Sequence, residues 1–182
     1  MRITIEEYDP AWAAHFQRLA ARYTGLLSGV PAVRVEHVGS TSVPELVAKP
    51  ILDIDIVVDK CDIPAAIRVL EGAGHISAGE LGIADRWVIR QPADWREGDI
   101  AVNLYVIAAG CAALRNHLAV RDALRRSAEL RLAYKQVKMQ LASSASMQEY
   151  CEGKTSFLLS ILRAESHCFT VDELAEIEEA NR

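Results

Sequence analysis

The sequence has few of the features that mark secreted, membrane or metal-stapled proteins. Its four cysteines are far apart and form no C-x-x-C pair, so their spacing predicts neither a zinc site nor a disulfide framework. The first residues contain no apolar segment of a signal peptide, and no apolar run approaches the roughly 18 residues that a membrane span requires. We therefore expect a cytoplasmic protein with no membrane partner.

Positive charge is also scarce, because 20 Lys and Arg residues face 25 Asp and Glu residues, which gives a net charge of −5. Such a chain is not expected to bind long nucleic acid through a general electrostatic field, although a local group of basic residues could bind a small anion. With 182 residues, 51 % of them hydrophobic, the chain is long enough to bury a core without a disulfide or a metal.

Hydrophobic patterning predicts an α/β or α+β fold in which a mixed core is followed by helices. The expected helices are 9–27, 62–74 and two or three segments within 111–163, and the expected strands are 33–38, 49–59, 86–91 and 100–108. The last two strands should form an antiparallel hairpin with a long tip. We expect one domain over residues 1–165, with a helical extension at about 111–163, and an acidic tail or short helix over 166–182.

Two aspartates interrupt the apolar strand "KPILDIDIVVD" and need an explanation. Residues two apart on a strand project from the same face, so Asp53 and Asp55 should point together, while Leu52, Ile54 and Ile56 line the core face. Two carboxylates this close repel, and burying either without a partner costs several kcal/mol. A divalent cation such as Mg²⁺ would relieve this repulsion. The alternative is a strand at the rim, with both aspartates solvated or paired with Arg and Lys.

The turn before this strand, "HVGST", favours an anion site. Backbone N–H groups of Gly39, Ser40 and Thr41, together with a hydroxyl group, could hold a phosphate at a helix start. Ser42 followed three residues later by Glu45 also matches a capping box of a short helix. Both interpretations are compatible, because capping would explain Ser42 and leave the three preceding residues for a ligand.

A strand, a Gly-Ser turn and a second strand with D-x-D resemble the nucleotidyltransferase fold of polymerase-beta-like enzymes. The stretch "YDPAW … RVEHVGSTSVPELVAKPILDIDIVV" and the later blocks "RNHLAVRDALRR", "LAYKQVK" and "YCEGKTSFL" closely resemble the GrpB family, which is assigned to that superfamily. The resemblance covers about residues 8–162. It implies a nucleotidyltransferase-like mixed sheet flanked by helices, with a C-terminal helical extension.

The resemblance also implies roles for individual residues. Gly39 and Ser40 would position nucleotide phosphates, and Asp53 and Asp55 would be catalytic ligands of Mg²⁺ or Mn²⁺. The superfamily's third carboxylate has no counterpart on strand 100–108, which has Asn103 and Tyr105 where the family carries an H-x-H-like pair. Either Asn103 supplies a weaker metal ligand, or Asp99 reaches in from the strand start, or the site binds without transferring anything.

Further phosphate ligands are implied by the same resemblance. They are His37, Lys49, His117, Arg121, Lys138 and Lys154, and Thr41 of the turn is a further candidate. Taken singly, each cation is as well explained by a solvated helix face. His37 could also act as a general base, or be held in place by a hydrogen bond. Trp87 and Trp95 could stack on a base, or pack in the core.

Two functions remain open at this stage. The first is a Mg²⁺-dependent enzyme that transfers a nucleotidyl group from a nucleoside triphosphate to an unknown small acceptor. The second is a catalytically inactive domain that binds a nucleotide or a protein partner and has lost the third metal carboxylate. Metal dependence would distinguish them, because only the transferase requires Mg²⁺ or Mn²⁺.

Overall fold

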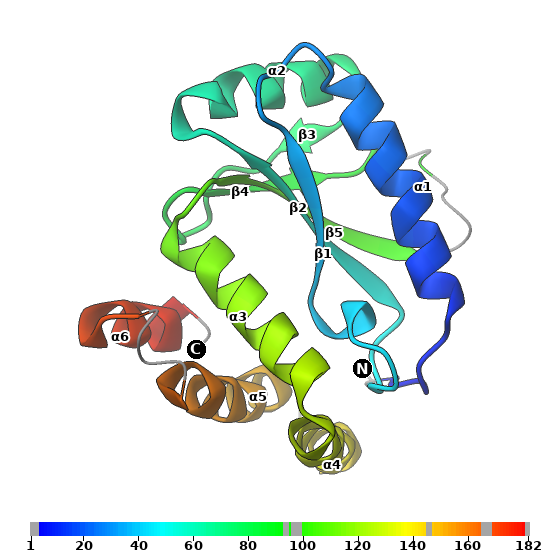
Figure 1. Ribbon diagram of the computed structural model, residues 1–182, viewed down its shortest axis with the longest axis vertical. Helices are drawn as coiled ribbons and strands as arrows, with labels where there is room; N and C mark the ends of the chain where they lie inside the picture. Colours follow the sequence, from blue (N-terminus) through cyan, green and yellow to red (C-terminus); the bar gives the residue numbers. More distant parts are fainter. Residues whose placement is uncertain (1–3, 93–94, 96–99, 145–146, 165–168, 181–182) are drawn as a thin grey trace.

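The computed structural model describes residues 4–92, 95, 100–144, 147–164 and 169–180, and its elements follow the predicted order (Figure 1). The helices are α1 (Ala11–Leu26), α2 (Ile63–Gly72), α3 (Ala112–Arg126), α4 (Ala128–Ser144), α5 (Met147–Ala164) and α6 (Val171–Ala180). The strands are β1 (Arg34–Val38), β2 (Ile51–Val58), β3 (Ile76–Ser77), β4 (Arg86–Arg90) and β5 (Ala101–Ala108). Short 3₁₀ turns, η1 (Ser40–Ser42) and η2 (Lys60–Asp62), follow β1 and β2.

The strands form one mixed sheet in the order β1-β2-β5-β4-β3. β2 and β5 are parallel and central, whereas β1 pairs with β2, and β4 with β5 and β3, in antiparallel fashion. The predicted hairpin of β4 and β5 and the predicted α/β class are therefore confirmed. The central place of β2 explains its nearly continuous apolar sequence, because one of its faces is buried and the other is partly covered.

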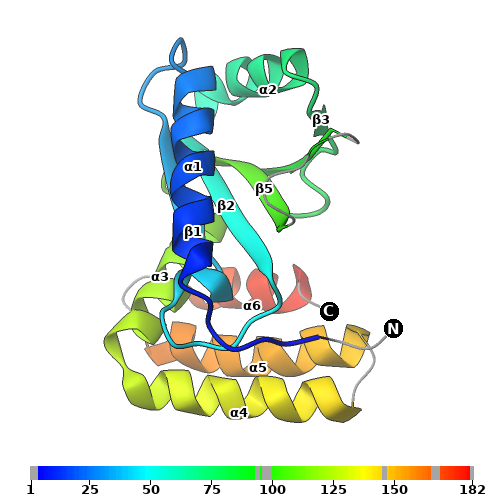
Figure 2. The same ribbon diagram turned by 90° about the vertical axis from the view of Figure 1, so that its right-hand side faces the viewer.

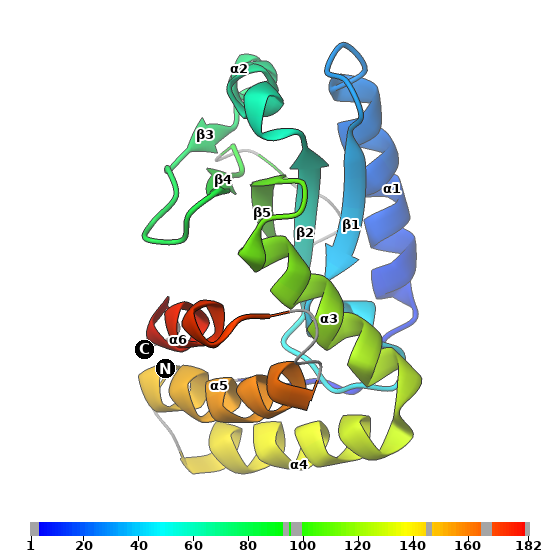
Figure 3. The ribbon, with the colours of Figure 1, turned by 60° about the vertical axis from the view of Figure 1, so that its left-hand side comes forward.

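The two faces of the sheet have different coverings, which decides where the aspartates lie. Leu52, Ile54 and Ile56 face α1 and α2 and belong to the main hydrophobic cluster, as the alternation predicts. On the opposite face, Val57 and Ile107 pack against the first turns of α3. Asp53 and Asp55 lie on this second face, which α3 covers only in part (Figure 3).

The segment of the predicted helical extension, 111–163, contains α3, α4 and α5. The helix α3 runs along the sheet, and α4 and α5 lie side by side beyond one end of it (Figures 2 and 3). Val43 and Leu46, in the loop before β2, pack into the extension in a cluster that includes Leu124 and Tyr134. The acidic C-terminal segment forms α6, which packs on α5 through the cluster around Leu162 and Phe169. No helix in the described ranges is long and apolar enough for a membrane span.

One local expectation differs from the structure, and one open alternative is decided by it. The predicted capping box is wrong, because Ser42 donates its hydroxyl to the Gly39 carbonyl at 2.6 Å and no α-helix begins there, while Glu45 has a positive φ of 66°. Trp87 and Trp95 both pack against the main cluster on the side of α1 and α2, away from the aspartate face. Both tryptophans therefore pack in the core and do not face the aspartates, where they could stack on a base.

Candidate functional site

The Gly-Ser turn touches the first aspartate directly. Gly39 has φ +67° and ψ −171°, a conformation that is almost confined to glycine. A Cβ at this position would lie 2.1 Å from Asp53 Oδ2, which is far inside van der Waals contact. The absence of a side chain at Gly39 is therefore what lets the turn and the carboxylate approach each other.

Asp53 is held by the neighbouring parallel strand. The register pairs Asp53 with Asn103, and the Asn103 amide donates to Asp53 Oδ1 at 2.8 Å. Burial raises the pKa of Asp53 above its ordinary value, and this hydrogen bond, followed by the field of His117, opposes the rise. A cation at this carboxylate would favour its charged form further.

Asp55 lies deeper and is paired with a histidine of α3. Its side chain has 0 % exposure, and His117 Nδ1 is 2.7 Å from Asp55 Oδ2. The other oxygen, Oδ1, is buried without a hydrogen-bond partner among the described residues. Because an unpartnered buried carboxylate oxygen is costly, this atom is a candidate ligand atom.

The oxygen atoms near Asp53 form a possible donor set for a metal ion. Asp53, Asp55 and Asn103 offer carboxylate and amide oxygens, which suit a hard cation such as Mg²⁺, and the orphaned Asp55 Oδ1 fits that role. Within the described ranges, no group of three His, Cys, Asp or Glu residues has a metal-binding arrangement. Two carboxylates and one weaker amide ligand would suit a single divalent ion at most.

A buried lysine contacts the same turn from the helical extension. Lys138 of α4 has 2 % exposure and donates hydrogen bonds to Ser40 Oγ and, at 2.8 Å, to the Val47 carbonyl. Burial lowers the pKa of Lys138 to about 7, and the neighbouring charge of Lys154 adds to the shift. An anion bound beside Ser40 would restore the charged ammonium.

Two further lysines surround a tyrosine of α5. Lys49 Nζ lies 4.6 Å and Lys154 Nζ 4.8 Å from the centre of the Tyr150 ring. Cations over an aromatic face are stabilised by its quadrupole, which allows several positive charges to gather close to one another. Both lysines contribute to the field at Lys138, so the three form one basic group.

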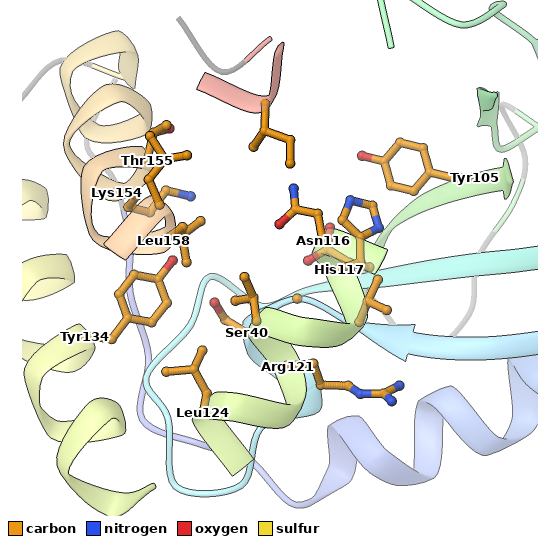
Figure 4. Close-up of a pocket in the computed structure, with 16 residues that line it drawn as sticks. Ser40, Tyr105, Asn116, His117, Arg121, Leu124, Tyr134, Lys154, Thr155 and Leu158 are labelled. Carbon is orange, nitrogen blue, oxygen red and sulfur yellow. The ribbon is translucent and has the colours of Figure 1, made fainter. Parts of the chain in front are cut away.

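Some of these residues border a cavity of about 320 Å³ between the sheet, α3 and α5 (Figure 4). Gly39, Ser40 and Asp53 line its sheet side, and Lys154 and Thr155 line the wall from α5. In Figure 4 the side chains of Tyr134 and Lys154 point toward the interior. The cavity therefore has the Asp53 carboxylate on one side and the Lys154 ammonium group on the other, which suits a phosphate ligand with a bound cation.

His37 and Thr41, both predicted phosphate ligands, lie outside this cavity. His37 pairs with Ile54 in the register and so faces α1, where its ring stacks on Phe16 at 4.6 Å. His37 Nε2 is 3.1 Å from Thr41 Oγ1, which donates to the Ile51 carbonyl. Burial lowers the pKa of His37 to about 4, which keeps the ring neutral. Both side chains hold the loop in place, so the prediction that they bind phosphate does not fit their positions.

Arg121 lines the cavity, but its guanidinium is already paired. It contacts Glu36 and Asp122 at 2.8 and 2.7 Å, and in Figure 4 it points away from the cavity interior. Asp99, the other predicted source of a third carboxylate, lies outside the described residues.

Sequence reasoning missed several residues of this site. Asn116, Tyr134, Thr155 and Tyr150 were not singled out as ligands, and the partner of His117 was not foreseen. The pairing of His117 with Asp55 joins residues 62 positions apart, so no local pattern could indicate it. The only available signal was the block "RNHLAVRDALRR", in which Asn116 and His117 are adjacent.

Comparison with known sequences identifies relatives over most of the chain. A family model described as GrpB protein matches residues 2–164. A UPF0157 protein of Halalkalibacterium halodurans is 38 % identical over 170 residues, covering 88 % of this chain and 81 % of the relative. One of Streptomyces coelicolor is 35 % identical over 166 residues, covering 88 % and 83 % of the two chains.

Comparison with solved structures identifies the same family and a wider fold. The crystal structure of conserved protein GrpB from Enterococcus faecalis superposes with a TM-score of 0.73 at 26 % identity, covering 90 % of this chain and 99 % of that one. The Cid1 poly(U) polymerase with MgGTP bound gives a TM-score of 0.55 at 14 % identity, covering 74 % and 44 %. This second likeness shows a nucleotidyltransferase-like fold and nothing about activity.

Proposed function

Since the chain belongs to the GrpB family and has a nucleotidyltransferase-like fold, we propose that it binds a nucleoside triphosphate with Mg²⁺ and transfers its nucleotidyl group to a small acceptor. The observation that carries this proposal is the contact between the Gly39 turn and Asp53, with Asp55 on the same strand and a basic group opposite. Such a site offers cations to phosphates and carboxylates to a metal ion.

Each residue has a defined role in this proposal. Ser40 and the ammonium group of Lys138 would contact the phosphates, and Lys154 would neutralise charge from the wall of α5. Asp53, Asp55 and Asn103 would hold Mg²⁺, which when bound reduces the charge of the phosphate oxygens. His117 would keep Asp55 in its orientation through their hydrogen bond.

A second candidate is a domain that binds the triphosphate without transferring anything. Asn103 favours it, because this residue stands beside Asp53 and donates a hydrogen bond where a further carboxylate would bind metal. An amide oxygen is a weaker Mg²⁺ ligand than a carboxylate. Both candidates share the phosphate site and differ only in catalysis.

Thermal unfolding with each nucleoside triphosphate, with and without Mg²⁺, tests the shared part. A ligand at a hundred times its Kd should stabilise the protein by about 2.7 kcal/mol, or roughly 5 to 10 °C at this chain length. We expect this shift only with Mg²⁺, and we expect it to vanish in the double variant Asp53→Asn/Asp55→Asn. Asp59→Asn is the matched control, because Asp59 is exposed beyond the end of the same strand.

Pyrophosphate release distinguishes the two candidates. The protein, a triphosphate that shifts its melting temperature, and a pool of small hydroxyl and amine compounds are incubated with Mg²⁺. Release that requires Asp53 and Asp55 supports transfer, while binding without release supports the second candidate. The absence of any triphosphate shift in the wild type would refute both.

A further inference from the structure

A second cavity adjoins the first along α3. It has a volume of about 580 Å³, within the range of small-molecule sites. Asn116, His117 and Ile177 line both cavities. A ligand in the second cavity would therefore lie next to the histidine that holds Asp55 and next to the proposed phosphate site.

Arg86 supplies an unsatisfied positive group to this second cavity. Its guanidinium lies over the Tyr105 ring, 4.7 Å from the ring centre. Its Nε atom is buried and has no hydrogen-bond partner in the part of the chain that the structure describes. The guanidinium is therefore not fully satisfied by the described residues, and an oxyanion of a ligand in the cavity, such as a carboxylate, would offset its charge.

The two acidic residues of the cavity differ in whether they already have partners within the protein. Glu173 pairs with Arg115 and accepts a hydrogen bond from the Thr170 backbone N–H at 2.9 Å, directly before α6. Its carboxylate is therefore already occupied by these two partners. Glu179, near the other end of α6, is exposed, and among the described residues no ion pair joins it to Arg86. One cation and one anion thus line the same cavity without neutralising each other.

The remaining walls are largely apolar and small. Ile83, Ala84, Ala112, Ala113 and Ile177 contribute them. A ligand that satisfies all three features needs an anionic group for Arg86, a cationic group for Glu179 and an apolar side chain for the remaining walls.

We infer that the second cavity is the acceptor site and that it takes a small zwitterion of amino-acid type with an apolar body. Its carboxylate would bind Arg86 and its ammonium group Glu179. This assignment of an acceptor rests on the proposed function, whereas the binding of the zwitterion does not require a nucleotide.

Leucine and its two half-ligands test the inference in the free protein, without nucleotide or Mg²⁺. The compound 4-methylpentanoate lacks the ammonium group of leucine, and 3-methylbutylamine lacks its carboxylate. Binding is followed by NMR through the Nε–H signal of Arg86, which is assigned by its loss in Arg86→Lys. We expect a saturable shift with leucine and at least about tenfold weaker binding of each half-ligand, as expected for one lost charged hydrogen bond.

Variants of Arg86 and Glu179 test which charged group of leucine each residue binds. Arg86→Gln should abolish the advantage of leucine over 3-methylbutylamine, and Glu179→Gln should abolish its advantage over 4-methylpentanoate. Arg90→Gln, which removes an exposed arginine of the same strand, should change neither. Backbone amide spectra of all variants confirm folding before affinities are compared.

The outcomes separate this inference from the proposed function. If leucine gives no saturable shift, or if all three compounds bind equally, the zwitterion site is wrong whatever the triphosphate experiment shows. If leucine binds through both charges while no triphosphate binds with Mg²⁺, the zwitterion site is supported. Its role as an acceptor site is then refuted together with the proposed function.

Discussion

Replacing Gly39 by alanine tests how closely the turn and Asp53 are fitted together. The new Cβ would lie 2.1 Å from Asp53 Oδ2 and 2.8 Å from its Cγ, so the carboxylate must move. The backbone strain at φ +67° adds about 1 to 3 kcal/mol. Displacing Asp53 from Asn103 removes a charged hydrogen bond that contributes roughly 1.5 to 3 kcal/mol.

Together these effects should lower the free energy of unfolding by about 2.5 to 6 kcal/mol, measured by urea denaturation. Gly79→Ala is the matched control, because Gly79 also has a positive φ, +80°, but a Cβ added there would have nothing within 4 Å. It should carry only the backbone strain, about 1 to 2 kcal/mol.

A double-mutant cycle isolates the clash from the strain. In Asp53→Gly both the carboxylate and the Cβ that would lie 2.9 Å from the new methyl group are absent, so adding Gly39→Ala should cost only its backbone strain, about 1 to 3 kcal/mol. We expect a coupling energy of about 2 kcal/mol between the two sites. If Gly39→Ala is no more destabilising than Gly79→Ala, or if the coupling is near zero, the close approach described above is refuted.

Two other predictions concern pH. His37 has a pKa lowered to about 4, so between this value and 6.5 the unfolded chain binds a proton that the native chain does not, and acidification over this interval should lower the stability by about 3 kcal/mol. Denaturation curves of His37→Gln should lack this component, and those of His15→Gln should retain it. Lys138 has a pKa lowered to about 7, so at pH 8 it is mostly neutral, and binding of a triphosphate should take up most of one proton per site. Calorimetry in buffers of different ionisation enthalpy measures this uptake, which Lys138→Met should abolish and Lys135→Met should leave unchanged.

The period-two pattern of strands correctly predicted which side chains of β2 face the core. The alternation in "ILDIDIVV" assigned Asp53 and Asp55 to one face and Leu52 and Ile54 to the core, and the structure confirms both. The same geometry applied to "RVEHV" could not decide which residues face α1, because Val35 and Val38 lie on opposite faces and both are apolar. The orientation of His37 therefore required the register with β2.

Partners far apart in the sequence were beyond local reasoning. Arg121 pairs with Glu36 across 85 positions, and Lys138 reaches Ser40 across 98. A helix pattern shows only that such residues are charged or solvated, and it does not show which distant group neutralises them. Ser42 and Glu45 illustrate the converse, because a sound local capping pattern was overridden when Val43 and Leu46 packed into the extension.

The hydrogen bonds of Lys138 have a consequence for how this fold can be shortened. An amine from α4 holds both Ser40 and the carbonyl of Val47, so the turn before the sheet is supported by a helix that comes late in the chain. A protein reduced to the sheet with α1 and α2 would keep both aspartates yet leave the turn hydroxyl without its donor. Minimal versions of this domain, whether made by engineering or by gene truncation, would have to retain α4 to keep a preorganised site.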